Sequence, residues 1–277
     1  MTPESEGRAA AEEFRAVHHL GVQPLGDLVA IIEQVTGIDV SVVDVGPDEH
    51  GLTMRDPVRG AVFIAVARTD RPMRRRSTLA HELAHVVFED WGVPDEELGT
   101  RAPAERRADA FSRHLLVPAE GLLALFGGRR GPDPSLLSDV VQRYLVSPAV
   151  AAIALHQAGL IDLDTKAAWM TMTTPVLAAR HGWSDQYRAL ADESDRHRAP
   201  QRLLTRAIDG YLAGVVSVAA IARLRGLPAD VVEQELRTAG LVPQDRGPVG
   251  WAPAHSVPVA GIAPAELDAD LPEGAPG

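Results

Sequence analysis

The sequence predicts an α+β fold that is mostly helical, with a small antiparallel sheet near its start and a helical region after it. Two observations predict this class. Three short apolar runs separated by turn residues lie between residues 40 and 67, a pattern typical of strands. After residue 70 the apolar residues recur at helical spacing, and the breaks fall at glycine and proline.

The first 70 residues predict one helix and three strands beyond an N-terminal helical extension over residues 1–19. The helix is expected at residues 24–36. The turn signals are Gly46-Pro47 and the stretch from Pro57 to Gly60. The three runs expected to form strands are VSVVDV (40–45), GLTMRD (51–56) and AVFIAVA (61–67).

A longer helix is predicted over residues 71–90, RPMRRRSTLAHELAHVVFED. Thr69 or Asp70 is expected as its N-cap, with Pro72 tolerated in the first turn. Leu79, Leu83, Val86 and Val87 supply its apolar surface. A helix buried on most sides holds polar groups at a cost unless they are paired.

This helix carries the string His81-Glu82-Leu83-Ala84-His85. Positions i and i+4 share one helix face, so His81 and His85 can present two imidazoles to one cation. Glu82 lies about 100° around the axis, from where it can reach a metal-activated water rather than the metal. This is the layout of a zinc-dependent hydrolase. The alternative is a core helix whose two histidines are merely hydrogen-bonded.

A second helix is predicted over residues 103–118, after a loop from Gly92 to Pro103 that turns the chain back. A catalytic zinc needs a third protein ligand, and Glu105 in the first turn is the best candidate. Asp109 falls at i+4 on the same face, where it could accept the N–H of a metal-bound imidazole.

The alternative for these two carboxylates is simple pairing on a solvated face with Arg106, Arg107 or Arg113. His114 lies nine residues after Glu105, about 180° around the helix, and is expected to be a surface or packing residue.

At this point the sequence resembles the ImmA/IrrE family of zinc metallopeptidases, over about residues 20–160. In that family a His-Glu-x-x-His helix is followed by a helix of the form Glu-x-x-Ala-(Asn/Asp)-x-Phe-(Ala/Ser) that ends in Leu-Leu-x-Pro. The matching residues of the second helix are Glu105, Ala108, Asp109, Phe111, Leu115, Leu116 and Pro118. The resemblance implies a zincin-like metallopeptidase domain.

The resemblance implies that His81, His85 and Glu105 bind one Zn²⁺ per chain and that Glu82 is the general base. It does not exclude manganese or iron at the same site. It also implies a regulatory endopeptidase that cleaves a helix-turn-helix transcriptional repressor encoded nearby. The alternative is a non-catalytic regulator that binds DNA or protein and in which the metal is structural.

Nothing in the sequence selects a residue that stabilises the oxyanion. The residues considered are Tyr144, His156, Tyr187 and Tyr211, each of which has a structural role as its simpler explanation.

Composition limits the possible ligands of the site and the expected location of the protein. The net charge is −11, from 27 basic and 38 acidic residues, and there is no cysteine, so disulfides and thiolate ligands are excluded. The acidic, polar start lacks the pattern of a signal peptide, and no apolar run approaches the length of a membrane span. We therefore expect a cytoplasmic protein with no membrane partner.

The sequence predicts four regions after the N-terminal extension. The metallopeptidase domain is expected at 20–125 and a helix-turn-helix-like segment, broken at Val146-Ser147-Pro148, at 126–162. A C-terminal helical region at 163–242 has a charged break near 192–200 and a second helix-turn-helix-like unit around Gly226-Leu227-Pro228. Residues 243–277, rich in proline, glycine and acid, are expected to be disordered.

Neither helix-turn-helix-like segment has the basic surface that DNA binding needs. The stretch from 133 to 162 has Arg143 as its one basic residue, against three aspartates. The later unit balances three arginines with three acids. Packing or protein docking is therefore favoured over direct DNA binding, and the arginines between Arg68 and Arg76 are expected to dock substrate or pair with acids.

Overall fold

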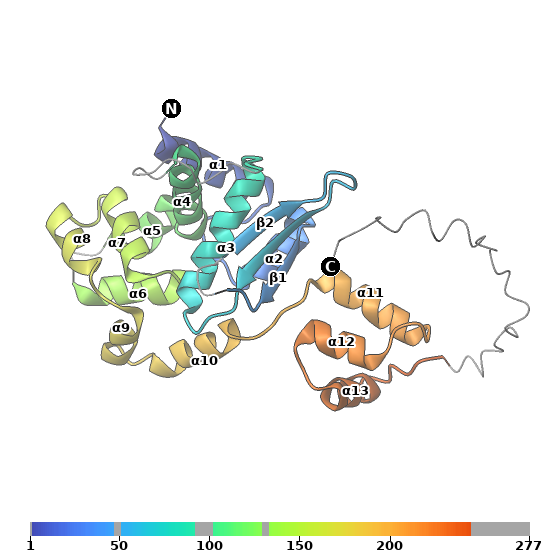
Figure 1. Ribbon diagram of the computed structural model, residues 1–277. Helices are drawn as coiled ribbons and strands as arrows, with labels where there is room; N and C mark the ends of the chain where they lie inside the picture. The colour runs from blue at the N-terminus through green and yellow to red at the C-terminus, as the bar shows by residue number, and fades with distance from the viewer. Residues whose placement is uncertain (1, 47–50, 92–101, 129–132, 245–277) are drawn as a thin grey trace, which may run out of the picture.

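The computed structural model describes residues 2–46, 51–91, 102–128 and 133–244, and it confirms the mostly helical α+β class (Figure 1). Predicted features at 92–101 and 245–277 lie outside the described residues. The elements in chain order are α1 Pro3–Val17, α2 Leu28–Thr36, β1 Asp39–Val43, β2 Gly51–Arg55, β3 Val62–Ala67, α3 Pro72–Val87, α4 Pro103–Leu116, α5 Ala119–Phe126, α6 Pro134–Tyr144, α7 Pro148–Gln157, α8 Leu163–Trp169, α9 Thr174–Arg180, α10 Ser184–Ser194, α11 Gln201–Leu212, α12 Val218–Arg225 and α13 Ala229–Thr238.

The sheet has the order β1-β3-β2 and is mixed rather than wholly antiparallel. β2 runs antiparallel to β3, as expected for neighbours joined by a short turn, but β1 runs parallel to β3. Three successive residues of β1, Val40 to Val42, are buried, a pattern typical of a strand covered on both faces. β2 has no such run and forms an edge of the sheet beside α3.

The free edge of β1 is covered by the segment that leads to the C-terminal helices. Val42 and Arg198 exchange two backbone hydrogen bonds, of 2.8 and 3.0 Å, in an antiparallel bridge. An ion pair of 2.7 Å between Arg198 and Asp27 supports the same contact. This pairing attaches the chain beyond α10 to the sheet.

Helix α3 begins at Pro72, and neither Thr69 nor Asp70 is its N-cap. Arg71 occupies the cap position without a side-chain cap bond, because an arginine side chain carries only donors; the hydroxyl of Thr69 accepts the backbone N–H of Arg71. The prediction of the cap was therefore wrong by one or two residues. Leu79 and Leu83 are buried as predicted, and each stabilises the fold by roughly 2 kcal/mol.

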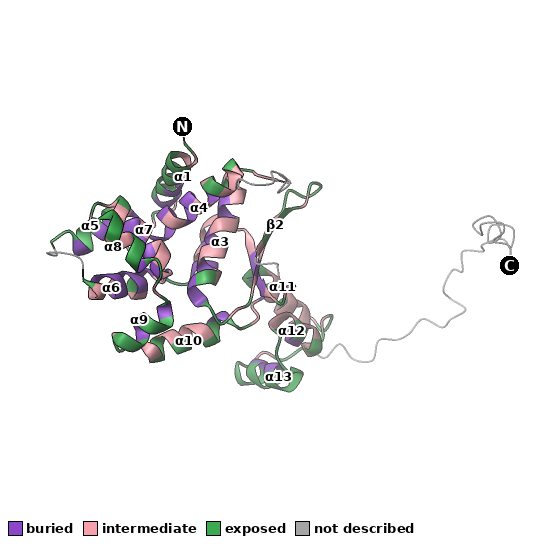
Figure 2. Ribbon diagram, turned by 60° about the vertical axis from the view of Figure 1, so that its left-hand side comes forward, coloured by how far each residue is buried: buried purple, intermediate pink, exposed green. Residues whose placement is uncertain are grey.

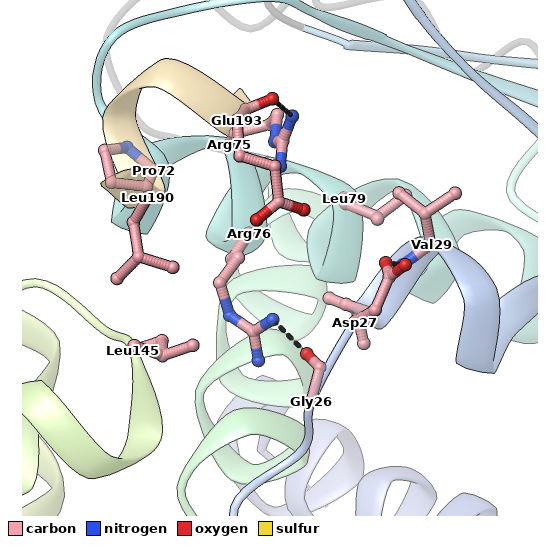
Figure 3. A pocket seen from close by; sticks show the side chains of 11 residues that line it. Gly26, Asp27, Val29, Pro72, Arg75, Arg76, Leu79, Leu145, Leu190 and Glu193 are labelled. Carbon is pink, nitrogen blue, oxygen red and sulfur yellow. Dashed lines mark hydrogen bonds between the residues drawn. The ribbon is translucent and has the colours of Figure 1, made fainter. Parts of the chain in front are cut away.

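Arg76 anchors the first turns of α3 to the chain that enters α2. Its guanidinium donates to the carbonyl of Gly26 at 2.6 Å and to that of Leu25 at 2.8 Å, as Figure 3 shows for Gly26. The adjacent cavity of about 130 Å³ is lined by residues of α2, α3 and α10 and by Leu145. It is too small for a peptide chain, and we regard Arg76 as a structural clamp.

Helix α1 packs along α4, so the N-terminal extension is part of the main helical layer (Figure 1). The two helices approach closely at Gly7, where a side-chain Cβ would lie 2.4 Å from the carbonyl oxygen of Arg107. Only glycine fits here, because a Cβ would clash with this carbonyl. Arg113 and His114 of α4 both bind Glu4 of α1.

The first segment predicted to be helix-turn-helix-like contains α6 and α7, joined through Leu145 in the left-handed conformation. Both helices are largely buried, and they contribute Leu137, Val141, Tyr144 and Leu155 to the main core. Among the described residues no single helix could cross a membrane by length and apolar character; α6 and α7 reach that length together but are bent by 108°.

The second segment predicted to be helix-turn-helix-like contains α12 and α13, which form a separate small core with partly buried residues of α11. Gly226 adopts the left-handed conformation between the two helices, as the predicted break implies. Figure 2 shows few buried residues in α11–α13 compared with α3, α4 and α6. Val232 and Ile221 are the most buried residues of this small core.

Candidate metal centre

The side chains of His81, His85 and Glu105 converge between α3 and α4. The Nε2 atoms of the two histidines lie 3.1 Å apart. Glu105 places Oε2 3.1 Å from Nε2 of His81 and Oε1 3.3 Å from Nε2 of His85. These three residues form the group, within the described part of the chain, that could hold a metal ion.

The spacing of these atoms fits a small tetrahedral cation. Ligand atoms about 2.1 Å from a tetrahedral zinc lie about 3.4 Å from one another. The observed separations of 3.1, 3.1 and 3.3 Å, two of which go to different oxygens of Glu105, are slightly shorter. Two imidazole nitrogens that face each other at 3.1 Å cannot both carry a proton without repulsion, and a shared cation removes this conflict. The donor set contains nitrogen and carboxylate oxygen, which zinc accepts in catalytic sites.

Asp109 lies behind His81, as its i+4 spacing from Glu105 predicts. Its Oδ1 is 3.1 Å from Nδ1 of His81, the ring nitrogen that faces away from the group. Burial by itself would lower the pKa of His81, but the hydrogen bond from Asp109 and the charge of Glu105 outweigh it, and the pKa is raised. Asp109 can therefore orient the imidazole and fix its tautomer.

Two of the three arginines named in the alternative pairing, Arg107 and Arg113, pair with other carboxylates. Arg107 binds Asp90 at 2.7 Å, and Arg113 binds Glu4. Both arginines thus have carboxylate partners outside the pair formed by Glu105 and Asp109.

Glu82 is held by strand β2 rather than by the three converging residues. The hydroxyl of Thr53 lies 2.7 Å from Oε2 of Glu82 and 3.2 Å from its backbone oxygen. A Cβ at Gly51 would lie 2.5 Å from Oε1 of Glu82, so the close approach of β2 depends on glycine. The carboxylate is therefore confined by β2, and its charge acts on His81.

The remaining polar residues have structural contacts. His114 is buried and bonded to Glu4, so the prediction of a packing role is confirmed. Tyr144 is fully buried in the main core, Tyr187 packs edge-on against Trp183, and Tyr211 packs on the core of α12 and α13. His156 lies in the last turn of α7. None of these residues gains support as an oxyanion donor.

Three residues near the site were missed by sequence reasoning: Gly51, Thr53 and Asp90. Gly51 and Thr53 were predicted only as part of a strand, and a strand pattern does not show which helix the strand faces. Asp90 was placed at the end of the helix without a role. Its position five residues after His85, just beyond the last helical turn, was a signal available in the sequence.

Comparison with protein families decides what kind of domain holds this site. Residues 34–156 match the model of the M78 peptidase family described as the IrrE N-terminal-like domain. The chain carries an IrrE N-terminal-like domain. Comparison with curated proteins gave no match.

The IrrE N-terminal-like domain contains all five residues predicted for the site, from His81 to Asp109. It also extends through α6 and α7. α1 and α8–α13 lie outside the matched range. A match to a peptidase family over residues 34–156, together with a group able to hold a metal, supports a metallopeptidase type of activity.

Proposed function

We propose that this chain is a zinc-dependent endopeptidase and that its substrate is a helix-turn-helix transcriptional repressor in the cytoplasm. The observation that carries the proposal is the position of Glu82. Its charge acts on His81, but its carboxylate is held by Thr53 and is not one of the converging ligands. A purely structural metal site has no need of such a carboxylate.

In this proposal His81, His85 and Glu105 hold the zinc, and Asp109 keeps His81 in the required orientation. Bound zinc would lower the pKa of a water and polarise the scissile carbonyl. Glu82 accepts a proton from the attacking water at its carboxylate and then delivers it to the leaving amine. Thr53 keeps that carboxylate in place by donating its hydroxyl hydrogen to Oε2.

The family resemblance supports a repressor as the substrate. The charges of α12 and α13 give little support to the alternative, which is direct binding of DNA. The α12–α13 unit has exposed acids next to its arginines, and two of those arginines, Arg225 and Arg237, pair with glutamates of the unit itself. A protein substrate is therefore more consistent with this surface than a phosphate backbone.

The test compares Glu82→Gln with His81→Ala and the wild-type chain, each incubated with the helix-turn-helix protein encoded nearest to its gene. Metal content is measured by elemental analysis and cleavage by mass spectrometry. We expect Glu82→Gln to retain zinc and lose at least 100-fold in cleavage rate. His81→Ala should lose both.

Two results would contradict the proposal. One is an active Glu82→Gln variant, because the base would then be another residue. The other is a zinc-loaded wild-type chain that cleaves no repressor but shifts DNA in a gel, which would favour the non-catalytic regulator. Manganese or iron in place of zinc would correct the metal alone.

A further inference from the structure

We infer that Asp90 is a positioning residue for His85: its carboxylate accepts the Nδ1–H of that imidazole and so leaves Nε2 free for a cation. Arg107 of α4 holds the carboxylate in place. The inference rests on the proposed metal site and adds a residue that neither the motif nor the family match names.

The end of α3 is built so that Asp90 turns back towards His85. The helix ends at Val87 with Phe88 as its C-cap, and Glu89 takes the left-handed conformation with φ of 54°. The N–H of Glu89 donates to the carbonyl of Val86, and the N–H of Asp90 donates to the carbonyl of His85 at 2.9 Å. This is the Schellman arrangement, which usually places glycine where Glu89 stands.

A non-glycine residue in this conformation is strained, and such strain persists only where surrounding contacts impose it. Here the surrounding contacts are those that the next residue, Asp90, makes. The turn fixes the backbone of Asp90 to the backbone of His85, so their side chains are kept near each other.

The carboxylate of Asp90 is buried, with 11% of the side chain exposed. Its Oδ1 accepts a hydrogen bond of 2.7 Å from Nη2 of Arg107. Its Oδ2 is buried and has no hydrogen-bond partner among the described residues. That oxygen lies 3.6 Å from Nδ1 of His85, and a small rotation of either side chain would bring the two into hydrogen-bond distance.

A buried carboxylate oxygen without a donor is costly, and the Nδ1–H of His85 is the nearby donor that would remove this cost. Nδ1 of His85 is the ring nitrogen that faces away from the converging trio, because Nε2 faces His81 and Glu105. A proton on Nδ1 therefore leaves the lone pair of Nε2 aimed at the proposed metal.

Arg107 is itself fixed on two further sides. Its guanidinium carbon lies 4.1 Å from the centre of the Phe88 ring, and its Nη1 lies 3.6 Å from Glu6 of α1. Arg107 also follows Glu105 by two residues on α4. The same helix thus supplies one proposed ligand and holds the residue that orients another.

The two histidines consequently have matching supports. Asp109 faces Nδ1 of His81, and Asp90 faces Nδ1 of His85. Asp90 is the more buried of the two carboxylates, with 11% of its side chain exposed against 38% for Asp109. Loss of Asp90 should therefore matter at least as much for metal binding.

The experiment uses Asp90→Asn in the full chain. Arg107 has only donors, so the new amide must turn its oxygen to Arg107 and its NH₂ to His85. His85 would then have to accept at Nδ1 and carry its proton on Nε2, which blocks the cation. Asp192→Asn, an exposed change on α10, is the matched control.

Zinc affinity is measured by competition with a chelator, and the protonation of the His85 ring by ¹⁵N NMR of the zinc-loaded protein. We expect wild type to carry the proton on Nδ1 of His85. Asp90→Asn should bind zinc at least about tenfold more weakly, while Asp192→Asn should match wild type.

Glu89→Gly tests the turn. Glycine relieves the strain but keeps the left-handed conformation, so zinc affinity should stay within twofold of wild type. If Asp90→Asn does not fold, Arg107→Met answers the question instead. This variant keeps the carboxylate of Asp90 but removes the guanidinium that binds it. It should weaken zinc binding by about threefold or more.

The inference is overturned if Asp90→Asn binds zinc within twofold of wild type, or if His85 keeps its proton on Nδ1 in that variant. It is equally overturned if Arg107→Met, used in its place, leaves zinc affinity unchanged. These readouts do not depend on peptide cleavage. A chain that cleaves nothing yet loses zinc on Asp90→Asn would refute the proposed function alone.

Discussion

The hydroxyl of Thr53 lies 2.7 Å from Oε2 of Glu82 and joins an edge strand to the helix that carries the metal motif. Because β2 is paired to β3 along its whole length, the hydroxyl is held by the sheet. Its direction is therefore fixed before any substrate binds. In the proposed enzyme this contact would keep the base pointing at the water.

Thr53→Val should lower kcat by about tenfold and leave KM and zinc content near wild type, because it removes the hydroxyl and keeps the shape. Thr53→Ser should restore most of the rate, since serine also carries a hydroxyl. Steady-state kinetics on the cleaved repressor checks both variants. Equal losses in the two would mean that the hydroxyl has no part in the reaction.

Gly51→Ala should displace the carboxylate of Glu82, because the new Cβ would lie 2.5 Å from Oε1 and 2.8 Å from Cγ2 of Thr78. We expect a loss of about 1–3 kcal/mol in the free energy of unfolding and a clear loss of cleavage. Gly128→Ala, where a Cβ meets nothing within 4 Å, is the control. Denaturant unfolding and kinetics measure the two effects, and identical behaviour of the two variants would refute the close approach.

Arg76→Met should destabilise the fold by about 2–3 kcal/mol, because it leaves the carbonyls of Leu25 and Gly26 without their charged donor. Burial lowers the pKa of Arg76 to about 10, in keeping with an enclosed guanidinium. Arg188→Met, which removes only an exposed pair with Asp185, should cost close to nothing. Urea unfolding of the two variants gives the comparison; a similar midpoint for both would contradict the clamp.

We expect the free energy of unfolding to fall in acid as Glu4 becomes protonated. Burial by itself raises the pKa of Glu4, but hydrogen bonds from Arg113, His114 and Gln157 outweigh it and lower the pKa from 4.5 to about 2. A lowered pKa in the folded state stabilises the fold above about pH 4.5, and this contribution is lost as pH falls towards 2.

The measurement for Glu4 is the difference in unfolding free energy between wild type and Glu4→Gln at several pH values. We expect about 1 kcal/mol at pH 6, less than the full shift implies, because the side chain is 46% exposed and screened by solvent. The difference should shrink between pH 4.5 and 2. A difference that stays constant over this range would show that the charge of Glu4 has no part.

The predicted domain boundaries stay predictions, but particular elements show what kind of information the sequence carries. The His81–His85 face and the Glu105–Asp109 face both follow from i, i+4 geometry, which is a property of a single helix. The three strands were likewise found from their own composition. The order of those strands was not, because alternation within a strand does not name its neighbour.

The buried position of α6 and α7 is a second feature that the local sequence pattern does not determine. Their pattern predicted a helix-turn-helix-like segment, and the two helices and the break are present. Whether such a pair is exposed for docking depends on what covers it. Here the main core does, through residues such as Leu137 and Leu155.

The sequence by itself determined the proposed ligands and base of this site, because their positions follow from the spacing of residues within a single helix, α3 or α4. Only the tertiary structure decided that Thr53 and Gly51 confine Glu82, and that Asp90, held by Arg107, faces His85. The physical reason is that these contacts join separate elements or follow a turn beyond the helix end. Their geometry is set by how the sheet and helices pack, which no local period encodes.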